Sequence, residues 1–372
     1  MNRRTLLRAV TVGSLVPAAA VGTATLGDDT ADTTTADEGA SDTDADTGSA
    51  DGEETPVSVR IVELPDEITG GALLEWTVEI ENLTDEAIRP TLECFVDGEP
   101  VGNVTLTIGP GERERPFPSS YRTEPVSDDD EVTVRAEING DADERTVRLR
   151  PTNELNSELQ FPDPELAVQS ETTVHFEVGA VEPDAGQTTT WWIDGENVGD
   201  TLADPWQGVY YVEQDAHYWQ ETFETDDNDA HEESYEVVAG VDVDGEQYRA
   251  NWTVTVTPDG LESPTIDATR PEPGTLELSP EGTTLEVDVT DPDENLERVV
   301  WWLSQADRLL DVSDVSGASD TATLAVASGR CDFCQLIPWV ITGDGTVTSD
   351  PLWDTIVPGI DPDGDDLETE FL

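Results

Sequence analysis

Lysine is missing from this 372-residue sequence, and the chain has only three cysteines, three histidines and one methionine. Without lysine there is no P-loop lysine, no Schiff base and no Ser–Lys catalytic pair. The sequence also contains no Gly-x-Ser-x-Gly elbow and no His-Glu-x-x-His zinc motif. Three cysteines are too few for a small fold held together by disulfides. These absences exclude several large classes of enzyme, and we expect the protein not to be an enzyme.

Basic residues are scarce, because 17 arginines stand against 84 acidic residues and give a formal net charge of −67. At low ionic strength such a charge repels itself and weakens the folded state. At about 1 M salt the screening length falls to about 3 Å, and most of this repulsion disappears. The lysine-free, carboxylate-rich composition fits a very salty medium and resembles that of proteins from halophilic archaea. The sign of the charge argues against nucleic acid and anionic membranes as partners.

The first 27 residues have the pattern of an export signal. Arg3 and Arg4 precede two leucines and Arg8, and an apolar stretch over 9–21 leads into small residues. The stretch is too short for a comfortable transmembrane helix, and the order of the zones is that of a signal peptide. The arginine pair resembles the twin-arginine signal, which implies export of the folded chain to the cell surface or the medium. We expect no membrane span in the mature chain unless the signal stays uncleaved.

The rest of the chain divides into a stalk, three modules and a tail. Residues 28–56 are acidic, rich in Thr and Ala, and free of aromatic residues, which predicts a disordered stalk. Short runs of alternating apolar and polar residues follow, separated by turn residues such as Asp244-Gly245. The pattern predicts an all-β fold of three tandem immunoglobulin-like antiparallel β-sandwiches. We place the modules at 57–150, 165–258 and 264–358, and an acidic tail at 359–372.

Two resemblances refine this prediction. The run Trp-Thr-Val-Glu-Ile-Glu-Asn over 76–82, with Gly-Pro-Gly at 109–111, resembles the cell-adhesion-related CARDB module. The second and third modules resemble each other, because a Pro-Asp pair precedes Trp191-Trp192 in one and Trp301-Trp302 in the other. This pattern is similar to the PKD and bacterial immunoglobulin-like modules of surface proteins. The resemblances imply a non-catalytic role in adhesion, scaffolding or recognition, with envelope proteins or glycans as partners.

Aromatic residues gather in the second module. Two interpretations stay open: the rings line the core, or some form an exposed platform that stacks on sugar rings or grips a partner. The platform would make the chain a carbohydrate-binding accessory module of extracellular polymer metabolism, which is the alternative to adhesion. Its candidate residues are Trp206, Tyr210, Tyr211 and Trp219, with Tyr218 and Phe223 nearby.

Two sets of side chains could bind a metal ion. Asp291, Asp293 and Asn295 alternate in a turn, which suits calcium with oxygen ligands, although a solvated turn explains them as well. We expect no other cofactor. His175 alternates with apolar neighbours and is expected to be a solvated strand residue. His217 and His231 lie in an acidic insert and could help to hold a metal, although their spacing does not require one.

The cysteines and the glycosylation motifs complete the candidate sites. Cys331 and Cys334 predict a local disulfide in an oxidising exterior, and a thiol–disulfide activity is the alternative. Cys94 has the strand position of a buried residue. Three Asn-x-Ser/Thr motifs predict N-glycosylation of an exported chain, at Asn82, Asn103 and Asn251.

Overall fold

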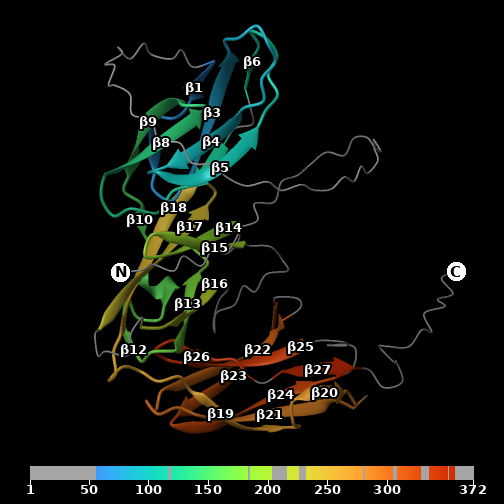
Figure 1. Ribbon diagram of the computed structural model, residues 1–372. Helices are drawn as coiled ribbons and strands as arrows, with labels where there is room; N and C mark the ends of the chain where they lie inside the picture. The colour runs from blue at the N-terminus through green and yellow to red at the C-terminus, as the bar shows by residue number, and fades with distance from the viewer. Residues whose placement is uncertain are drawn as a thin grey trace, which may run out of the picture. The chain divides into compact units, whose positions relative to one another are not determined.

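The computed structural model describes most of the chain after residue 55, and all of this part belongs to one unit, Glu54–Leu372. Strands make up most of it, so the predicted all-β fold of antiparallel sandwiches is confirmed (Figure 1). The predicted signal and stalk, before Pro56, and the predicted acidic tail lie outside the described residues. These are 56–115, 119–182, 185–202, 216–225, 232–279, 281–304, 308–327, 335–350 and 352–356.

Module one is a sandwich of two sheets, coloured blue to green in Figure 1. One sheet has the order β1-β3-β6, with β7 also on β3, and the other has the order β2-β9-β8-β4-β5. The alternation of the sequence places Trp76 and Ile80 of β3 in the core between them. The strands are β1 Val57–Glu63, β2 Glu67–Thr69, β3 Leu73–Asn82, β4 Thr91–Val96, β5 Glu99–Thr105, β6 Arg113–Glu114, β7 Ser119–Arg122, β8 Asp130–Ile138 and β9 Asp141–Arg150.

Module two has one sheet with the order β10-β18-β17-β14-β15, with β12 on β18, and a second formed by β11, β13 and β16. The predicted Asp244-Gly245 turn joins β17 to β18, and both of its residues have positive φ (51° and 88°), as a two-residue hairpin turn requires. A short 3-10 turn, η1, covers Ser157–Leu159. The strands are β10 Asn153–Glu154, β11 Gln160–Phe161, β12 Glu165–Val168, β13 Thr172–Gly179, β14 Gln187–Ile193, β15 Glu196–Leu202, β16 Ala216–Phe223, β17 Glu233–Val243 and β18 Glu246–Val256.

Module three has a three-stranded sheet with the order β19-β21-β24, and a second sheet that contains β22, β23, β25, β26, β27 and β20. Its core lies between them, around Trp301 and Trp353. The strands are β19 Thr265–Arg270, β20 Gly274–Glu277, β21 Thr283–Thr290, β22 Leu296–Leu303, β23 Arg308–Gly317, β24 Ser319–Val326, β25 Gln335–Thr342, β26 Thr346–Thr348 and β27 Trp353–Ile356.

The resemblance between modules two and three extends to their strand pairing. In module two β12 pairs in parallel with β18, β13 pairs with β16, and β14 pairs with β15 and β17. In module three β20 pairs in parallel with β27, β21 pairs with β24, and β22 pairs with β23 and β25. The register shifts at the same point in both, between Trp191 and Trp192 and between Trp301 and Trp302. The two modules are therefore copies of one topology.

Modules two and three also share a sheet. Strand β26 of module three pairs with β25 of its own module and, antiparallel, with β13 of module two. This pairing joins strands from both modules into one nine-stranded sheet. Six strands follow the order β11-β13-β26-β25-β22-β23, and β16, β27 and β20 pair at its sides. The backbone N–H of His175 extends the contact by donating to the carbonyl of Gly345 at 2.8 Å. Backbone hydrogen bonds thus connect two modules that the sequence pattern presents as separate units.

Candidate functional site

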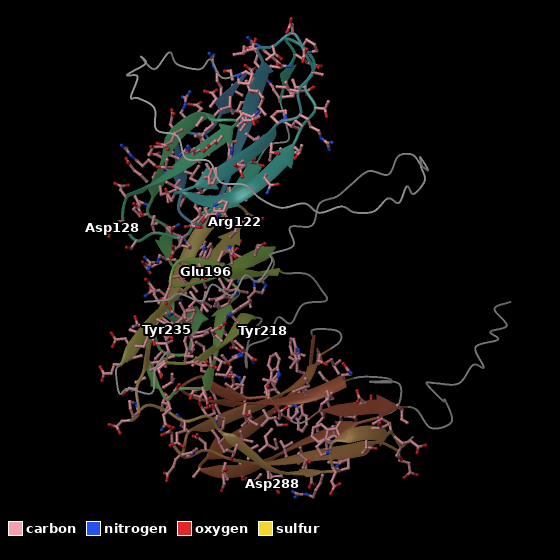
Figure 2. All side chains as sticks on the ribbon, in the orientation of Figure 1. Arg122, Asp128, Glu196, Tyr218, Tyr235 and Asp288 are labelled. Carbon is pink, nitrogen blue, oxygen red and sulfur yellow. The ribbon has the colours of Figure 1, made fainter. Side chains whose placement is uncertain are left out.

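The best-defined cluster outside the three sandwich cores lies between modules two and three, and we call it the joint. Trp302 and Trp339 stack with ring centres 4.5 Å apart. Tyr218 of module two, labelled in Figure 2, sets its ring against both, at 5.3 and 5.2 Å. Such ring pairs add to the energy of apolar burial. The apolar residues of the joint are Phe161, Val300, Trp302, Trp339, Ile341 and Val347, with Tyr218 packed against them.

Three ionisable side chains are sealed inside this joint. Glu177 Oε1 lies 2.8 Å from His175 Nε2 and 3.1 Å from Arg298 Nη2. The side chains of His175 and Glu177 are fully buried, and that of Arg298 is 2 % exposed. Arg298 also pairs with the partly exposed Glu297, and its guanidinium lies 4.6 Å above the ring of Phe161. Module two therefore supplies the buried carboxylate and module three supplies its cation.

The protonation state of His175 follows from its surroundings. Burial lowers its pKa most; hydrogen bonding to Glu177 and that residue's charge oppose the shift, while the charge of Arg298 adds to it. The ring is therefore neutral at pH 7. The side-chain amide of Gln220 donates to Nδ1 at 3.0 Å, so Nε2 carries the hydrogen and donates it to Glu177. The Nε2–H of His175 and the guanidinium of Arg298 therefore both face Glu177 Oε1.

The structure corrects the expectation that His175 is a solvated strand residue. Its neighbours Val174 and Phe176 point into the core of module two, as the alternation predicts. The opposite face of β13 is covered by the joint, so His175 is buried as well. His217 on β16 is also buried; its Nδ1 lies 2.9 Å from Thr189 Oγ1, and burial lowers its pKa to about 4. His231 lies outside the described residues.

The predicted aromatic platform is described only in part. Trp219 is half-buried and packs against the core of module two, while its Nε1 donates to Glu221 at 3.1 Å. A Cβ atom on Gly199 would come within 3.0 Å of the Trp219 ring, so the indole lies directly on the neighbouring backbone. The core-lining interpretation therefore fits Trp219. Trp206, Tyr210 and Tyr211 lie outside the described residues.

The predicted calcium residues lie in an ordered turn after β21. Asp291 is only 2 % exposed, and its Oδ2 accepts a hydrogen bond from the backbone N–H of Asn295 at 2.8 Å. Asp293 Oδ2 accepts from the backbone N–H of Glu262 at 3.0 Å, and the Asn295 amide donates to Asp344. A simply solvated turn does not account for Asp291. Within the described ranges, no three His, Cys, Asp or Glu side chains converge to hold a metal on their own.

The three glycosylation motifs differ in accessibility. Asn103 on β5 is exposed, and Asn251 on β18 is half-buried beside the buried Trp252. Asn82 is fully buried: its amide nitrogen donates to the carbonyls of Glu86, Ile108 and Gly109, and its oxygen accepts from Thr84. That nitrogen would have to carry the glycan. The structure therefore argues against Asn82 as an acceptor in the folded chain, where it holds a turn together.

Of the cysteines, only Cys94 belongs to the described part of the chain. It is a buried free thiol in the core of module one, with Sγ 3.7 Å from Ser119 Oγ, and burial raises its pKa. A buried thiol with a raised pKa is a poor nucleophile. The predicted disulfide between Cys331 and Cys334 lies outside the described residues.

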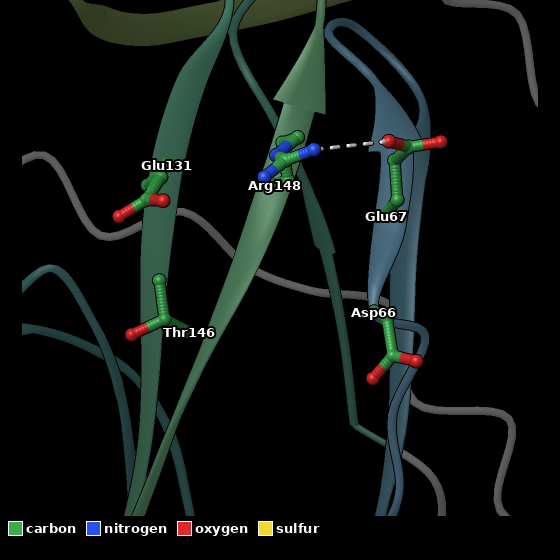
Figure 3. Close-up of a pocket in the computed structure, with 5 residues that line it drawn as sticks. All are labelled: Asp66, Glu67, Glu131, Thr146 and Arg148. Atoms are coloured by element: carbon green, nitrogen blue, oxygen red, sulfur yellow. Dashed lines mark ion pairs between the residues drawn. The ribbon is translucent and has the colours of Figure 1, made fainter.

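An open hollow of about 460 Å³ lies on the outer face of module one (Figure 3). Arg148 of β9 stands between two carboxylates on neighbouring strands, opposite Glu131 of β8 and Glu67 of β2. Its Nη1 lies 3.9 Å from Glu67 Oε2, and Asp66 and Thr146 complete the wall. All five side chains are exposed, so the hollow is a row of solvated cross-strand pairs and not an enclosed site.

Most of the residues of the joint were not identified from the sequence. Glu177, Arg298, Trp302 and Trp339 were not candidates, yet one signal was present. Strand β22 is apolar at every position from Val299 to Leu303, which is typical of a strand covered on both faces. In the described residues no helix is long and apolar enough to cross a membrane.

Comparisons with known proteins bear on the fold alone. No family model and no curated protein matches the chain. A CARDB domain of the PF1109 protein from Pyrococcus furiosus, solved with di-metal ions, is 16 % identical, with 26 % of this chain and 93 % of that chain covered and a TM-score of 0.23. A β-glucosidase from Listeria innocua in complex with glucose is 16 % identical, with 25 % and 16 % covered and a TM-score of 0.23. Each likeness covers about a quarter of this chain.

Proposed function

We propose that this chain is a non-catalytic, exported surface protein whose modules serve adhesion, scaffolding or recognition at high salt. The observation that carries the proposal is the joint. A shared sheet, a stacked aromatic cluster and a buried ion pair join modules two and three. Such a joint favours a fixed relation between two sandwiches, which suits a protein that presents surfaces to a partner.

The chemistry of the joint supports a role other than catalysis. His175, Glu177 and Arg298 bring an imidazole, a carboxylate and a guanidinium together, which are groups that can also serve in catalysis. All three are sealed from solvent, and no substrate can reach them without separating the modules. Glu177 Oε1 faces both His175 and Arg298, His175 also contacts Gln220, and Arg298 also donates to Glu297. The constellation therefore stabilises the interface between the modules.

The surroundings of the protein are inferred from its charge and its first residues. A chain with net charge −67 and no lysine is best suited to concentrated salt, and the arginine pair at Arg3 and Arg4 favours export in folded form. Replacement of both by lysine keeps the charge and should hold the precursor in the cell. Export of the R3K/R4K variant at the wild-type level would contradict the twin-arginine assignment.

A binding experiment tests the proposed function. The purified chain in multimolar KCl is incubated with isolated cell envelopes and with a glycan panel, and bound protein and ligand are both analysed by mass spectrometry. We expect saturable binding to an envelope protein or glycan, with no chemical change in it. Turnover of the ligand, or no binding to any envelope component, would contradict the proposal.

The same experiment separates adhesion from carbohydrate binding. A Trp206→Ala/Tyr210→Ala variant removes two candidate platform residues, and an Arg148→Ala variant serves as a control on the exposed face of module one. Loss of glycan binding in the first variant alone would assign recognition to module two and favour the carbohydrate-binding alternative. Retained binding in both would place recognition elsewhere on the chain. Trp219→Ala is avoided, because this ring packs against the core of module two.

A further inference from the structure

The turn after β21 contains two buried oxygen atoms that no donor in the described structure satisfies. Asp291 Oδ1 and Asn295 Oδ1 are both enclosed and have no hydrogen-bond partner. Asp291 as a whole is 2 % exposed, and its other oxygen is held by the backbone of Asn295. A buried oxygen acceptor without a donor is costly, so two such acceptors in one turn, one from a carboxylate and one from an amide, point to an electropositive ligand.

The charges around this turn favour the same conclusion. The Asn295 amide ties the turn to Asp344, which lies in the loop between β25 and β26. The carboxylates of Asp163, Asp293 and Asp291 lie near enough for their charges to act on Asp344. These carboxylates come from three separate segments of the chain. The charges that act on Asp344 are all negative, and a bound cation would compensate them.

We propose that Asp291, Asn295 and Asp344 bind one Ca²⁺ ion, which braces the joint between modules two and three. The donor set consists of carboxylate and amide oxygens, which suits calcium, because calcium accepts six to eight oxygen ligands in flexible geometry. Magnesium requires near-ideal octahedral geometry and gives up its water reluctantly. Two carboxylates and one amide make a sparse site, so water must complete the shell. Extracellular calcium modules of this kind bind with a Kd of about 0.1–1 mM.

The position of the site connects the ion to the joint. Asp344 belongs to the same loop as Gly345, whose carbonyl accepts the hydrogen bond from the His175 N–H of β13. A Cβ atom on Gly345 would come within 2.6 Å of Pro162, so this loop lies against module two. A cation that binds Asp344 to the Asp291 turn therefore restrains the loop that carries β26 into the shared sheet. Calcium should slow opening of the β13–β26 pairing.

The test is a calcium titration of the full chain, stripped of metal, in multimolar KCl. High salt is essential, because a chain with 84 acidic residues attracts divalent ions everywhere at low ionic strength. We expect one calcium ion per chain in calorimetry, at least tenfold weaker magnesium binding, and slower hydrogen exchange in β13 when calcium is present. No saturable calcium binding in the wild type would overturn the proposal.

Matched variants locate the site. Asp291→Asn and Asp344→Asn each remove one charge and should weaken calcium binding at least tenfold. Asn295→Asp adds a ligand charge and should tighten it several-fold, which a merely disruptive change would not do. Asp244→Asn removes the same charge from the exposed hairpin turn of module two and should change nothing. Calcium affinity equal to the wild type in both Asp291→Asn and Asp344→Asn would refute the site. Because partner binding is measured separately, this result stands apart from the proposed function.

Discussion

Replacement of Glu177 by Gln tests whether the buried ion pair holds the joint. The substitution keeps the size of the side chain and removes the counter-charge of Arg298, a guanidinium that is 2 % exposed. Loss of one partner of a buried pair costs about 3–5 kcal/mol, because the remaining charge is left without compensation. Arg298 keeps Glu297 and the ring of Phe161, so we expect the lower end, about 3 kcal/mol. For a unit of two modules this corresponds to about 6–12 °C in melting temperature.

The internal repeat provides a matched control for this experiment. Asp288 on β21 occupies the position in module three that Glu177 occupies in module two, and it is labelled in Figure 2. It binds Arg270 at 2.7 Å, but this pair is exposed to water. An exposed pair contributes little, so Asp288→Asn should leave the melting temperature nearly unchanged. The comparison holds residue type and strand position almost constant and changes only the burial.

The assay is urea unfolding in multimolar KCl, followed by tryptophan fluorescence and by hydrogen exchange. Exchange in β13 and β22 reports on the joint, and exchange in β8 of module one serves as an internal reference. The double variant Glu177→Gln/Arg298→Met should recover much of the loss, because an apolar replacement of a whole buried pair is often neutral. Costs that simply add in the double variant, or a Glu177→Gln effect no larger than that of Asp288→Asn, would refute the reasoning.

Three further predictions concern single residues. The pKa of His217 is lowered to about 4 in the folded chain, so the unfolded chain binds this proton first as the pH falls. The free energy of unfolding should therefore be unaffected by this group above about pH 7 and should fall by up to about 3 kcal/mol toward pH 4. In urea unfolding between pH 7.5 and 5.5, the free energy of unfolding should change less with pH in His217→Gln than in the wild type, and an equal change would contradict this. Asn82→Ala leaves three carbonyls without their donor and should lower the free energy of unfolding by about 2–3 kcal/mol. In the wild type, glycopeptide mapping should find glycan at Asn103 and none at Asn82. Cys94 should not react with thiol reagents until the chain unfolds. The unfolded chain should then contain one reactive thiol, and a count of three reactive thiols would exclude the predicted Cys331–Cys334 disulfide.

Period-two patterns predicted the strands because one face of each sheet meets a core and the other meets water. In β3 and β8 this rule holds, and buried residues alternate with more exposed ones. The hairpin at Asp244-Gly245 was predictable for a related reason, because few residue pairs accept positive φ twice. The repeat of modules two and three was visible in the double tryptophans, and the strand pairing bears it out.

The same reasoning failed where a second module covers the outer face. The sequence around His175 alternates like that of any half-buried strand, so nothing local shows that Tyr218 and Trp339 lie over it. The double tryptophans were the better signal. Adjacent residues of a strand point to opposite faces, so two neighbouring buried indoles require two covered faces. Trp301 enters the core of its own module, and Trp302 enters the joint.

The same arrangement of two adjacent tryptophans is found on the side of module two that faces module one. Trp191 belongs to the core of module two, whereas Trp192 is buried on the other face of β14. A Cβ atom on Gly240 would come within 2.8 Å of the Trp192 ring and within 2.7 Å of Pro125, a residue of module one. In both copies, therefore, the first tryptophan of the pair lies in the core of its own module, and the second lies on the face toward the module before it.

In the part of the chain that the structure describes, the corresponding face of module three carries polar side chains where module two has the joint. His175 and Glu177 in β13 correspond to Glu286 and Asp288 in β21, and Tyr218, paired with Glu177, corresponds to the exposed Thr321, paired with Asp288. Arg270 binds both carboxylates of this face from solvent. A polar face cannot gain the apolar burial that holds the joint. At this cross-strand position an aromatic residue thus marks the face that packs against another module, and threonine marks the face that carries ion pairs in the described residues.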